Sequence, residues 1–334
     1  MGARSASVGP PDQSRRIAER LGQLAPQAAG RSVIRVKQSQ PEEIAVARRV
    51  VVTGGSGKLG KAVVAELRAH GWKPVVVDKV PHPDREVASV VADLRDLGQA
   101  TEVLSTVDSR FRRVDALVHL AAVPGPGLAT NSATFENNLM TTYNLFTSAI
   151  RAGVNTVVWA SSETLLGIPF TAAPPYLPVD ENCPARPESS YSLAKHLEET
   201  MATEVARWNP DLSLTALRLS NVLDETDYPR LADHQADATV RRRSNLWAYV
   251  DKRDGAQAVR KALEHAVPGY RMFVIANADT VVERPTAELV AEQFPDVPTT
   301  REFAGHETLL CIDKARRDLN YEPKFSWRDS LRGN

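Results

Sequence analysis

Tyr191 and Lys195 have the types and the spacing of a proton-transfer pair. They stand four residues apart in a segment with a helical pattern, so both side chains share one helix face. A phenol titrates near pH ~10, and acid–base work at neutral pH therefore needs a neighbouring charge that stabilises the phenolate. The Lys195 ammonium, one turn away, provides that charge. In isolation such a pair is more often a surface tyrosine beside a solvated lysine, so other residues must decide.

Ser162 is the candidate that completes this set. It follows Ser161 at the end of the apolar run 157–160, which has the pattern of a buried strand. Ligands bind at the carboxyl ends of parallel strands, so a hydroxyl there can hydrogen-bond the substrate oxygen that Tyr191 protonates or deprotonates. We expect Ser162, Tyr191 and Lys195 to be the catalytic residues and Ser161 to be structural.

A glycine-rich turn earlier in the chain predicts a dinucleotide site. It reads Thr-Gly-Gly-Ser-Gly-Lys-Leu-Gly at 53–60, between a strand-like run and a helical run. Glycines there let backbone N–H groups and the helix N-terminus approach a pyrophosphate. The expected contacts in the turn are Gly54, Gly57, Lys58, Leu59 and Gly60. The alternative is a strand-to-helix turn that holds no ligand.

Asp78 indicates which dinucleotide binds. It closes the second strand-like run, 18 residues after Gly60, where a carboxylate accepts hydrogen bonds from the ribose hydroxyls and repels a 2′-phosphate. We therefore expect NAD as the cofactor. Lys58 and Lys79 keep NADP open, because a basic group near that ribose can accommodate the phosphate.

The elements that must hold these residues alternate between short β-branched runs and helical patterns, which predicts parallel strands joined by crossover helices. The expected strands are 50–52, 75–77, 87–91, 116–120, 156–159 and 214–219, with helices at 61–69, 135–151 and 188–207. Beyond 221 we expect helices at 254–265, 286–293 and 307–316 and a strand at 272–275. Near-continuous apolar strands indicate a sheet covered on both faces. The predicted fold class is α/β, a Rossmann-type doubly wound parallel sheet with a small C-terminal substrate lobe.

Three regions follow from this pattern. Residues 1–47 are rich in Arg, Gln, Ala, Ser and Pro and are expected to be a flexible extension; a transit peptide is an alternative, which Asp12 and Glu19 disfavour. We expect 48–220 to be the NAD(P)-binding domain and 221–334 to be mainly the substrate lobe, with some elements returning to the core. Within the helix 188–207, a stripe is expected to pack against the sheet: Leu193, Leu197, Met201 and Val205.

The bulk composition excludes several classes of protein. Lys+Arg and Asp+Glu number 41 each and the isoelectric point is near 7.1, so no overall field attracts nucleic acid or an anionic membrane. No apolar run reaches the ~18 residues that span a bilayer. Cys183 and Cys311 are too few for a disulfide framework or a zinc site. We expect a cytoplasmic protein with no metal, nucleic-acid or membrane partner.

The ordered motifs resemble the extended short-chain dehydrogenases/reductases of the NAD-dependent epimerase/dehydratase group, from residue 50 to about 330. The motifs that carry the resemblance are the glycine turn, Asp93-Leu94, His119-Leu120-Ala121-Ala122, Asn137-Asn138 at the opening of a helix, Ser161-Ser162, Tyr191 with Lys195, and the run 218–222. The resemblance implies cofactor contacts at Asp93, Leu94, Leu120, Ala121, Ala122 and Asn137. It implies that Lys195 binds the nicotinamide ribose and lowers the Tyr191 pKa, and that Ser162 polarises the substrate. It also implies a homodimer.

A narrower resemblance is to the uronate dehydrogenases. It rests on Leu59-Gly60, on Pro-Ala-Arg-Pro at 184–187 and on Arg230, which in that family meets the substrate carboxylate. That family's Ser-Ser-Asn-His is Ser-Ser-Glu-Thr at 161–164 here, and Pro124 stands where a serine is expected. Glu163 would repel a bound carboxylate unless it is protonated or turned away. The candidate substrate-binding residues are Pro124, Ser162, Glu163, Asn221 and Arg230, and neutral sugars, polyols and hydroxy-ketones remain open.

The sequence thus predicts an NAD(P)-dependent oxidoreductase that moves hydride between nicotinamide and a small, sugar-like or polyol substrate. The alternative is a sugar or sugar-nucleotide epimerase or dehydratase that retains NAD, although the Gly-Asp-Gly segment with which such enzymes usually hold a nucleotide diphosphate is missing around 241–251. A third reading, a non-catalytic NAD(P)-sensing protein, has no need of the proton-transfer set.

Three further features have a structural interpretation beside a functional one. His119 is expected to be a packed, hydrogen-bonded core histidine. The arginines at 241–243 either grip a phosphate or lie on a solvated loop. Trp247 and Tyr249 either stack on a sugar ring or fill the second lobe.

Overall fold

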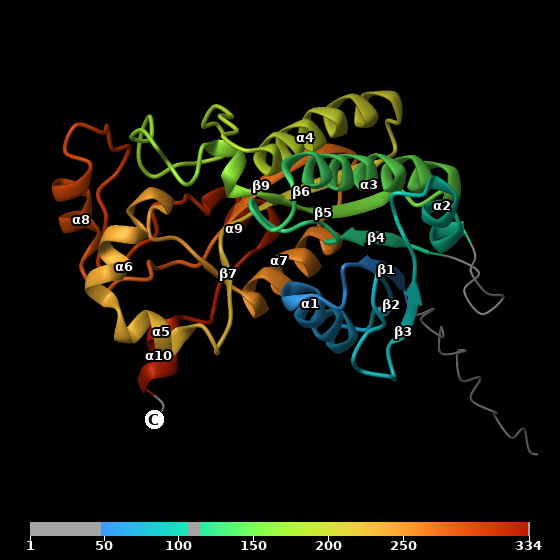
Figure 1. Ribbon diagram of the computed structural model, residues 1–334, viewed down its shortest axis with the longest axis horizontal. Coiled ribbons are helices and arrows are strands. Elements are labelled where there is room, and N and C mark those ends of the chain that lie inside the picture. The colour runs from blue at the N-terminus through green and yellow to red at the C-terminus, as the bar shows by residue number, and fades with distance from the viewer. Residues whose placement is uncertain (1–47, 106–113, 333–334) are drawn as a thin grey trace, which may run out of the picture. The chain divides into compact units, whose positions relative to one another are not determined.

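The computed structural model describes residues 48–105 and 114–332 (Figure 1). The predicted N-terminal extension, 1–47, lies outside the described residues. The centre of the fold is a seven-stranded sheet in the order β3-β2-β1-β4-β5-β6-β9, in which every pair of neighbours is parallel. Its strands are β1 (Arg49–Thr53), β2 (Lys73–Asp78), β3 (Ala88–Val91), β4 (Ala116–His119), β5 (Thr156–Ser162), β6 (Ser213–Leu219) and β9 (Gly269–Ile275). The predicted fold class is confirmed.

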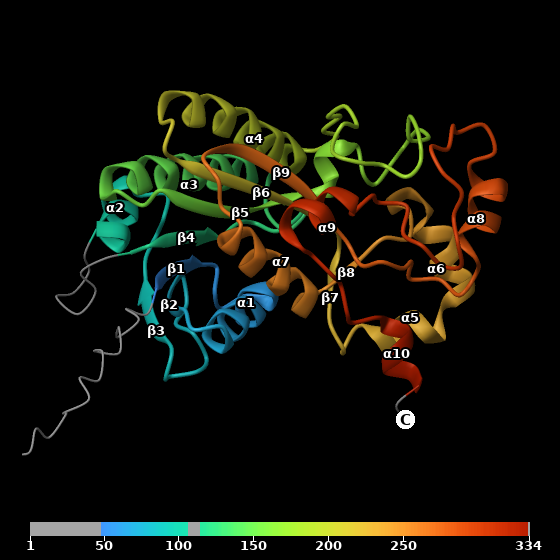
Figure 2. The ribbon, with the colours of Figure 1, turned by 180° about the vertical axis from the view of Figure 1, so that it is seen from behind.

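Helices cover both faces of this sheet, as the apolar strands require. On one face α1 (Lys58–Ala69) packs against α7 (Lys252–Glu264), and on the other α2 (Leu97–Ser105), α3 (Asn131–Ala152) and α4 (Ser190–Trp208) lie side by side (Figures 1 and 2). Successive residues of β1 serve the two layers: Val50 and Val52 pack in the core with α1, while Val51 belongs to the core with α2 and α3. Because all seven strands are parallel, their carboxyl ends lie at the same end of the sheet, and the candidate site lies there.

Smaller elements complete the part of the chain after β6. They are β7 (Val222–Leu223), β8 (Val250–Asp251), α5 (Tyr228–Asp233), α6 (Gln235–Arg241), the 3-10 turn η3 (Arg243–Asn245), α8 (Thr286–Gln293), α9 (Asp313–Leu319) and α10 (Trp327–Arg332), and a further 3-10 turn, η2 (Glu163–Leu166), follows β5. The pattern predicted α7, α8 and β9 but missed α2, and it missed α5, α6, α10 and the β7-β8 pair because these elements are short. β9 lies in the main sheet beside β6.

Two predicted helix starts are wrong. The helix expected at 307–316 begins only at Asp313, because the preceding segment pairs instead with the loop at Val179: Val179 N donates to Leu309 O at 2.9 Å and Cys311 N donates to Val179 O at 2.8 Å. The helix expected at 135–151 begins at Asn131, since the Thr130 hydroxyl caps it by accepting from Ala133 N. Asn137 therefore lies inside α3 and does not open it.

The stripe predicted to pack α4 on the sheet is correct only in part: Val205 is buried and Met201 packs against the core, but the stripe does not extend to the start of the helix. Leu193 is 40% exposed, and the buried face of α4 includes Tyr191, Lys195 and two consecutive glutamates, Glu198 and Glu199. Charged residues can occupy this face because each finds a buried partner of opposite charge. The helix thus points its titratable groups into the fold.

Candidate active site

The glycine turn has the shape that a bound pyrophosphate needs. Gly54 has a φ of +71°, and a Cβ on Gly60 would lie 2.1 Å from the Gly54 carbonyl oxygen, so neither position accepts a side chain. Gly57 precedes α1, and no side chain caps that helix. The first N–H groups of α1 are therefore left for an anion. These features fit a dinucleotide.

Asp78 stands at the end of β2, beside this turn. Its carboxylate accepts hydrogen bonds from Ser56 N at 3.0 Å and Lys79 N at 2.7 Å, which fix its orientation. The Lys79 ammonium reaches across to the Asn137 side-chain oxygen at 3.3 Å. Asp78, Lys79 and Asn137, all predicted to contact the cofactor, therefore lie at the same end of the site.

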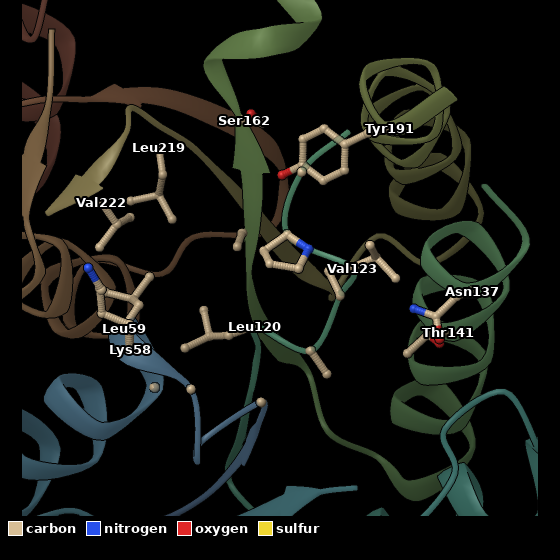
Figure 3. A pocket seen from close by; sticks show the side chains of 18 of the residues that line it. Lys58, Leu59, Leu120, Val123, Asn137, Thr141, Ser162, Tyr191, Leu219 and Val222 are labelled. Carbon is tan, nitrogen blue, oxygen red and sulfur yellow. The ribbon is translucent and has the colours of Figure 1, made fainter. Parts of the chain in front are cut away.

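A single cavity of about 780 Å³ brings the predicted residues together. Its wall includes every predicted catalytic and cofactor-binding residue, and, of the predicted substrate-binding residues, Pro124, Ser162, Glu163 and Asn221. Figure 3 shows Asn137 and Thr141 entering from α3 on one side, Leu219 and Val222 from the other, and Lys58 and Leu59 from the start of α1. Arg230 is exposed on α5 and is absent from this wall. The structure therefore does not bring Arg230 to the other predicted residues.

Tyr191 enters the cavity from the first turn of α4, with its ring directed toward the end of β5 (Figure 3). Burial raises the pKa of Tyr191 overall, and the Lys195 charge and a hydrogen bond from Ser162 offset part of that rise. The Ser162 oxygen accepts from Thr164 N at 3.2 Å and from Thr164 Oγ1 at 3.0 Å, which leaves its own O–H free to donate. The arrangement can stabilise a phenolate beside a hydroxyl donor.

Lys195 has a partner that the sequence reading missed. Its ammonium donates to Ala160 O at 2.8 Å and to Glu198 Oε2 at 2.9 Å, and both side chains of the ion pair are buried. Burial by itself lowers the pKa of Lys195, but the Glu198 and Tyr191 charges outweigh it and the net pKa is raised. An ammonium has three donors, so one remains for a ligand. The i, i+3 spacing on α4 was the available signal for this pair.

A second buried cluster lies directly behind the first. Glu199 accepts hydrogen bonds from Ser161 Oγ at 2.6 Å, from Arg218 Nη2 at 2.8 Å and from the Tyr270 hydroxyl at 2.8 Å. Arg218 also donates to Glu181 O at 3.1 Å. Ser161 therefore has the structural contacts expected of it.

His119 is a core histidine, as predicted. It is buried at the end of β4, with Nδ1 2.8 Å from Thr53 Oγ1 and Nε2 3.1 Å from Thr142 Oγ1. Burial lowers the pKa of His119 to about 3, and the Lys195 charge acts in the same direction. The ring is neutral at ordinary pH and both of its nitrogens are occupied.

Trp247 and Tyr249 take their structural interpretation, whereas the arginines at 241–243 lie outside the cavity wall with Arg242 and Arg243 half-buried, not on a solvated loop. Trp247 and Tyr249 are fully buried outside the cavity wall, where Trp247 Nε1 donates to Thr239 O and the Tyr249 hydroxyl to Asp279. Arg241 pairs with Asp237 at 2.7 Å, and Arg243 donates to Gln293 O at 2.8 Å. These side chains pack and bond among the segments after β6 without lining the cavity.

Neither a metal-binding cluster nor a membrane-spanning helix is present among the described residues. No group of three or more His, Cys, Asp or Glu residues at 48–105 and 114–332 has the arrangement of a metal site. Within those same ranges, no helix is long and apolar enough to cross a bilayer. The homodimer and the cytoplasmic location stay predictions.

Residues 50–276 match the family model described as the NAD dependent epimerase/dehydratase family. The chain belongs to this family. The predicted family is thereby confirmed, and the chain is an NAD(P)-dependent enzyme.

Curated relatives in this family fall into two activities. The L-arabinose 1-dehydrogenase (NAD(P)(+)) of Haloferax volcanii is 29% identical over 230 residues, which cover 66% of this chain and 84% of that protein. The UDP-glucose 4-epimerase of Rhizobium leguminosarum bv. trifolii is 25% identical over 322 residues, which cover 85% of this chain and 95% of that protein. One of these two relatives is named a dehydrogenase and the other an epimerase.

Solved structures repeat the fold. A short-chain dehydrogenase/reductase superfamily protein from Agrobacterium tumefaciens with bound NAD has a TM-score of 0.64 at 23% identity, over 85% of this chain and 95% of that one. A UDP-glucose-4-epimerase from Stenotrophomonas maltophila with bound NAD and formylated UDP-arabinopyranose has a TM-score of 0.66 at 20% identity, over 85% and 96%. At these identities the likeness concerns the fold alone.

Proposed function

We propose that the chain is an NAD-dependent dehydrogenase that interconverts a hydroxyl and a carbonyl on a sugar-like or polyol substrate. The observation that carries this proposal is that Ser162, Tyr191 and Lys195 line the same cavity as the glycine turn. A sensor of the dinucleotide would need the turn but not the proton-transfer set. The segments after 221 that lie outside the main sheet would form the substrate side, with Asn221 and Val222 in the cavity wall.

In the oxidation of an alcohol, Tyr191 takes the proton of the substrate hydroxyl while the hydrogen on the same carbon leaves as hydride. NAD supplies the acceptor for that hydride when it is bound. In the reverse direction the Tyr191 hydroxyl returns the proton to the carbonyl oxygen. Ser162 donates a hydrogen bond to the same oxygen, and the Lys195 charge keeps the Tyr191 pKa below the value that burial alone would give.

We propose NAD in preference to NADP for this chain. Asp78 would accept hydrogen bonds from the adenosine ribose, and its charge would repel a 2′-phosphate. Lys79, the basic residue nearest in sequence, already donates to Asn137. The third N–H of Lys195 would bind the nicotinamide ribose.

An epimerase that retains NAD is the second candidate. The observation that favours it is the 25% identity to a UDP-glucose 4-epimerase over nearly that protein's whole length. The same three residues would serve it, because such a reaction also begins with removal of a hydroxyl proton and hydride.

One experiment separates the two. The purified enzyme is mixed with NAD and a panel of aldoses, polyols and UDP-sugars, and the absorbance of the reduced cofactor is followed while products are separated by chromatography. A lasting increase in reduced cofactor with a free sugar or polyol supports the dehydrogenase. Conversion of a UDP-sugar with no lasting increase replaces it by the epimerase.

A further inference from the structure

Glu163 gives the substrate end of the cavity an unusual group. It follows Ser162 directly, at the start of η2, and it lines the cavity although it is only 5% exposed. No described residue hydrogen-bonds its Oε2 atom, and that atom is shielded from solvent. A buried carboxyl oxygen without a partner beside the reacting residues is costly to maintain, which points to a ligand that completes it.

The groups that face Glu163 come from three other segments. They are Tyr191 on α4, Ser220 just after β6, and Arg242 between α6 and η3. Burial raises the pKa of Glu163 to about 7, and the Ser220 hydroxyl and Arg242 charge oppose that rise without cancelling it. No ion pair within 4 Å joins Arg242 to Glu163: one nitrogen of the Arg242 guanidinium donates to Ala248 O at 2.7 Å, and its Nε is buried without a hydrogen-bond partner among the described residues. Glu163 therefore changes charge near neutral pH.

The cations of the cavity wall are already engaged. Lys58 lies 2.6 Å from Asp227, Lys79 donates to Asn137, and Lys195 pairs with Glu198. No arginine of the described ranges belongs to that wall. A carboxylate or a diphosphate taken out of water needs cations or several donors to replace its hydration. The remaining Lys195 donor is assigned to the cofactor. At the substrate end an anion would therefore meet the Glu163 carboxyl group and no free cation of the cavity wall.

We propose that Glu163 is a specificity-determining residue, which makes this site select an uncharged polyhydroxylated substrate whose hydroxyl bonds the Glu163 carboxyl group, and reject uronates and sugar nucleotides. The inference rests on the proposed function, because the cavity end is a substrate site only if Ser162 and Tyr191 act there. A hydroxyl suits both states of Glu163, since it accepts from the protonated acid and donates to the carboxylate. An anionic substrate is repelled as soon as Glu163 loses its proton.

The test compares matched neutral and acidic sugars. Initial rates with NAD are measured for D-galactose, L-arabinose, D-galacturonate and UDP-galactose at about pH 6 and about pH 8.5, on either side of the Glu163 transition. The variants are Glu163→Gln, which keeps the shape and removes the charge, and Glu188→Gln, an exposed matched control paired with Arg186. Thermal unfolding shows that each variant is folded.

The ratio of kcat/KM for galactose to that for galacturonate isolates Glu163, because titration of Tyr191 affects both substrates and cancels. In the wild type and in Glu188→Gln we expect this ratio to favour galactose at both pH values and to increase about tenfold or more from the lower to the higher pH. In Glu163→Gln the increase is expected to vanish.

Other results overturn the inference in distinguishable ways. Equal or better use of galacturonate, or a ratio whose pH dependence survives in Glu163→Gln, overturns the role of Glu163 while the dehydrogenase stands. Conversion of UDP-galactose without lasting cofactor reduction, or no turnover of either neutral sugar, overturns the inference together with the proposed dehydrogenase.

Discussion

Two buried polar clusters occupy the same stretch of α4 and β5, and their difference separates chemistry from structure. Ser161 bonds Glu199 in one, and Ser162 and Glu198 belong to the other, although both serines line the cavity. The Glu199 cluster is saturated: its carboxylate accepts from Ser161, Arg218 and Tyr270. The cavity cluster is not, because Glu198 Oε1 and Glu163 Oε2 have no hydrogen-bond partner among the described residues.

The contrast teaches how buried charge can serve two purposes. A charge whose bonding capacity is filled by the protein fixes the packing of strands and helices. A charge left partly unfilled next to a cavity retains bonds for a ligand, at a cost in stability. The variants below exchange or remove one member of each cluster.

The largest effect is expected from Tyr191→Phe. Removing the acid–base hydroxyl should reduce kcat by about 10²- to 10⁴-fold and leave NAD binding nearly unchanged, since the phenyl ring keeps its packing. Steady-state rates measure kcat, and titration with NAD measures cofactor binding. The matched variant is Tyr270→Phe, which removes a hydroxyl from the saturated cluster and should lower stability without the loss of kcat. Full activity in Tyr191→Phe would contradict the assignment.

Glu199→Gln should have the largest effect on folding. It leaves buried Arg218 without its charged partner, and breaking such a pair costs about 3–5 kcal/mol. Urea unfolding measures the loss, and Glu204→Gln, in an exposed pair with Arg207, should cost less than about 1 kcal/mol. If Glu199→Gln were as stable as the wild type but inactive, the saturated cluster would be part of the chemistry.

Replacing the two serines tests the boundary between the clusters. Ser162→Ala removes the hydroxyl that would bond the reacting oxygen, and a hydrogen bond to a charged group contributes about 1.5–3 kcal/mol, so kcat should fall about 10- to 150-fold. Ser161→Ala should instead lower the free energy of unfolding and keep kcat. The reverse pattern would exchange their roles.

His119 provides a smaller, pH-dependent effect. Its pKa is depressed to about 3, below the ordinary 6.5, so between these pH values the unfolded chain binds a proton that the folded protein refuses. The stability due to neutral His119 is therefore present above pH 6.5 and is lost as the pH falls toward 3, at up to about 1.4 kcal/mol per pH unit. Urea unfolding at several pH values should show a shallower dependence in His119→Gln. An identical dependence in both proteins would exclude this source.

Local signals explain which parts of the site could be predicted from sequence. The glycine turn, Asp78 and the Tyr191–Lys195 pair depend on residues close together in the chain, and the structure places all of them on one cavity. The Glu198 contact was missed although its i, i+3 spacing from Lys195 on α4 is a local signal. The burial of Glu163 was missed because it depends on how β5 and the segment near Arg242 pack. Arg230 shows the opposite error: its spacing matched a known pattern, but α5 leaves it exposed. The short elements after β6 lacked the length that makes periodicity visible.

The position of β9 has a consequence for how the protein is made. Its seven residues pair along the full length of β6, although about 50 residues separate the two strands in the chain. During synthesis β6 remains an open sheet edge until residue 275 has left the ribosome, and such an edge can pair with another chain. The intervening segment, 220–268, must therefore fold, or remain clear of the β6 edge, before β9 can pair with β6. A slow step there would expose nascent chains to aggregation even though the finished protein has no such edge at β6.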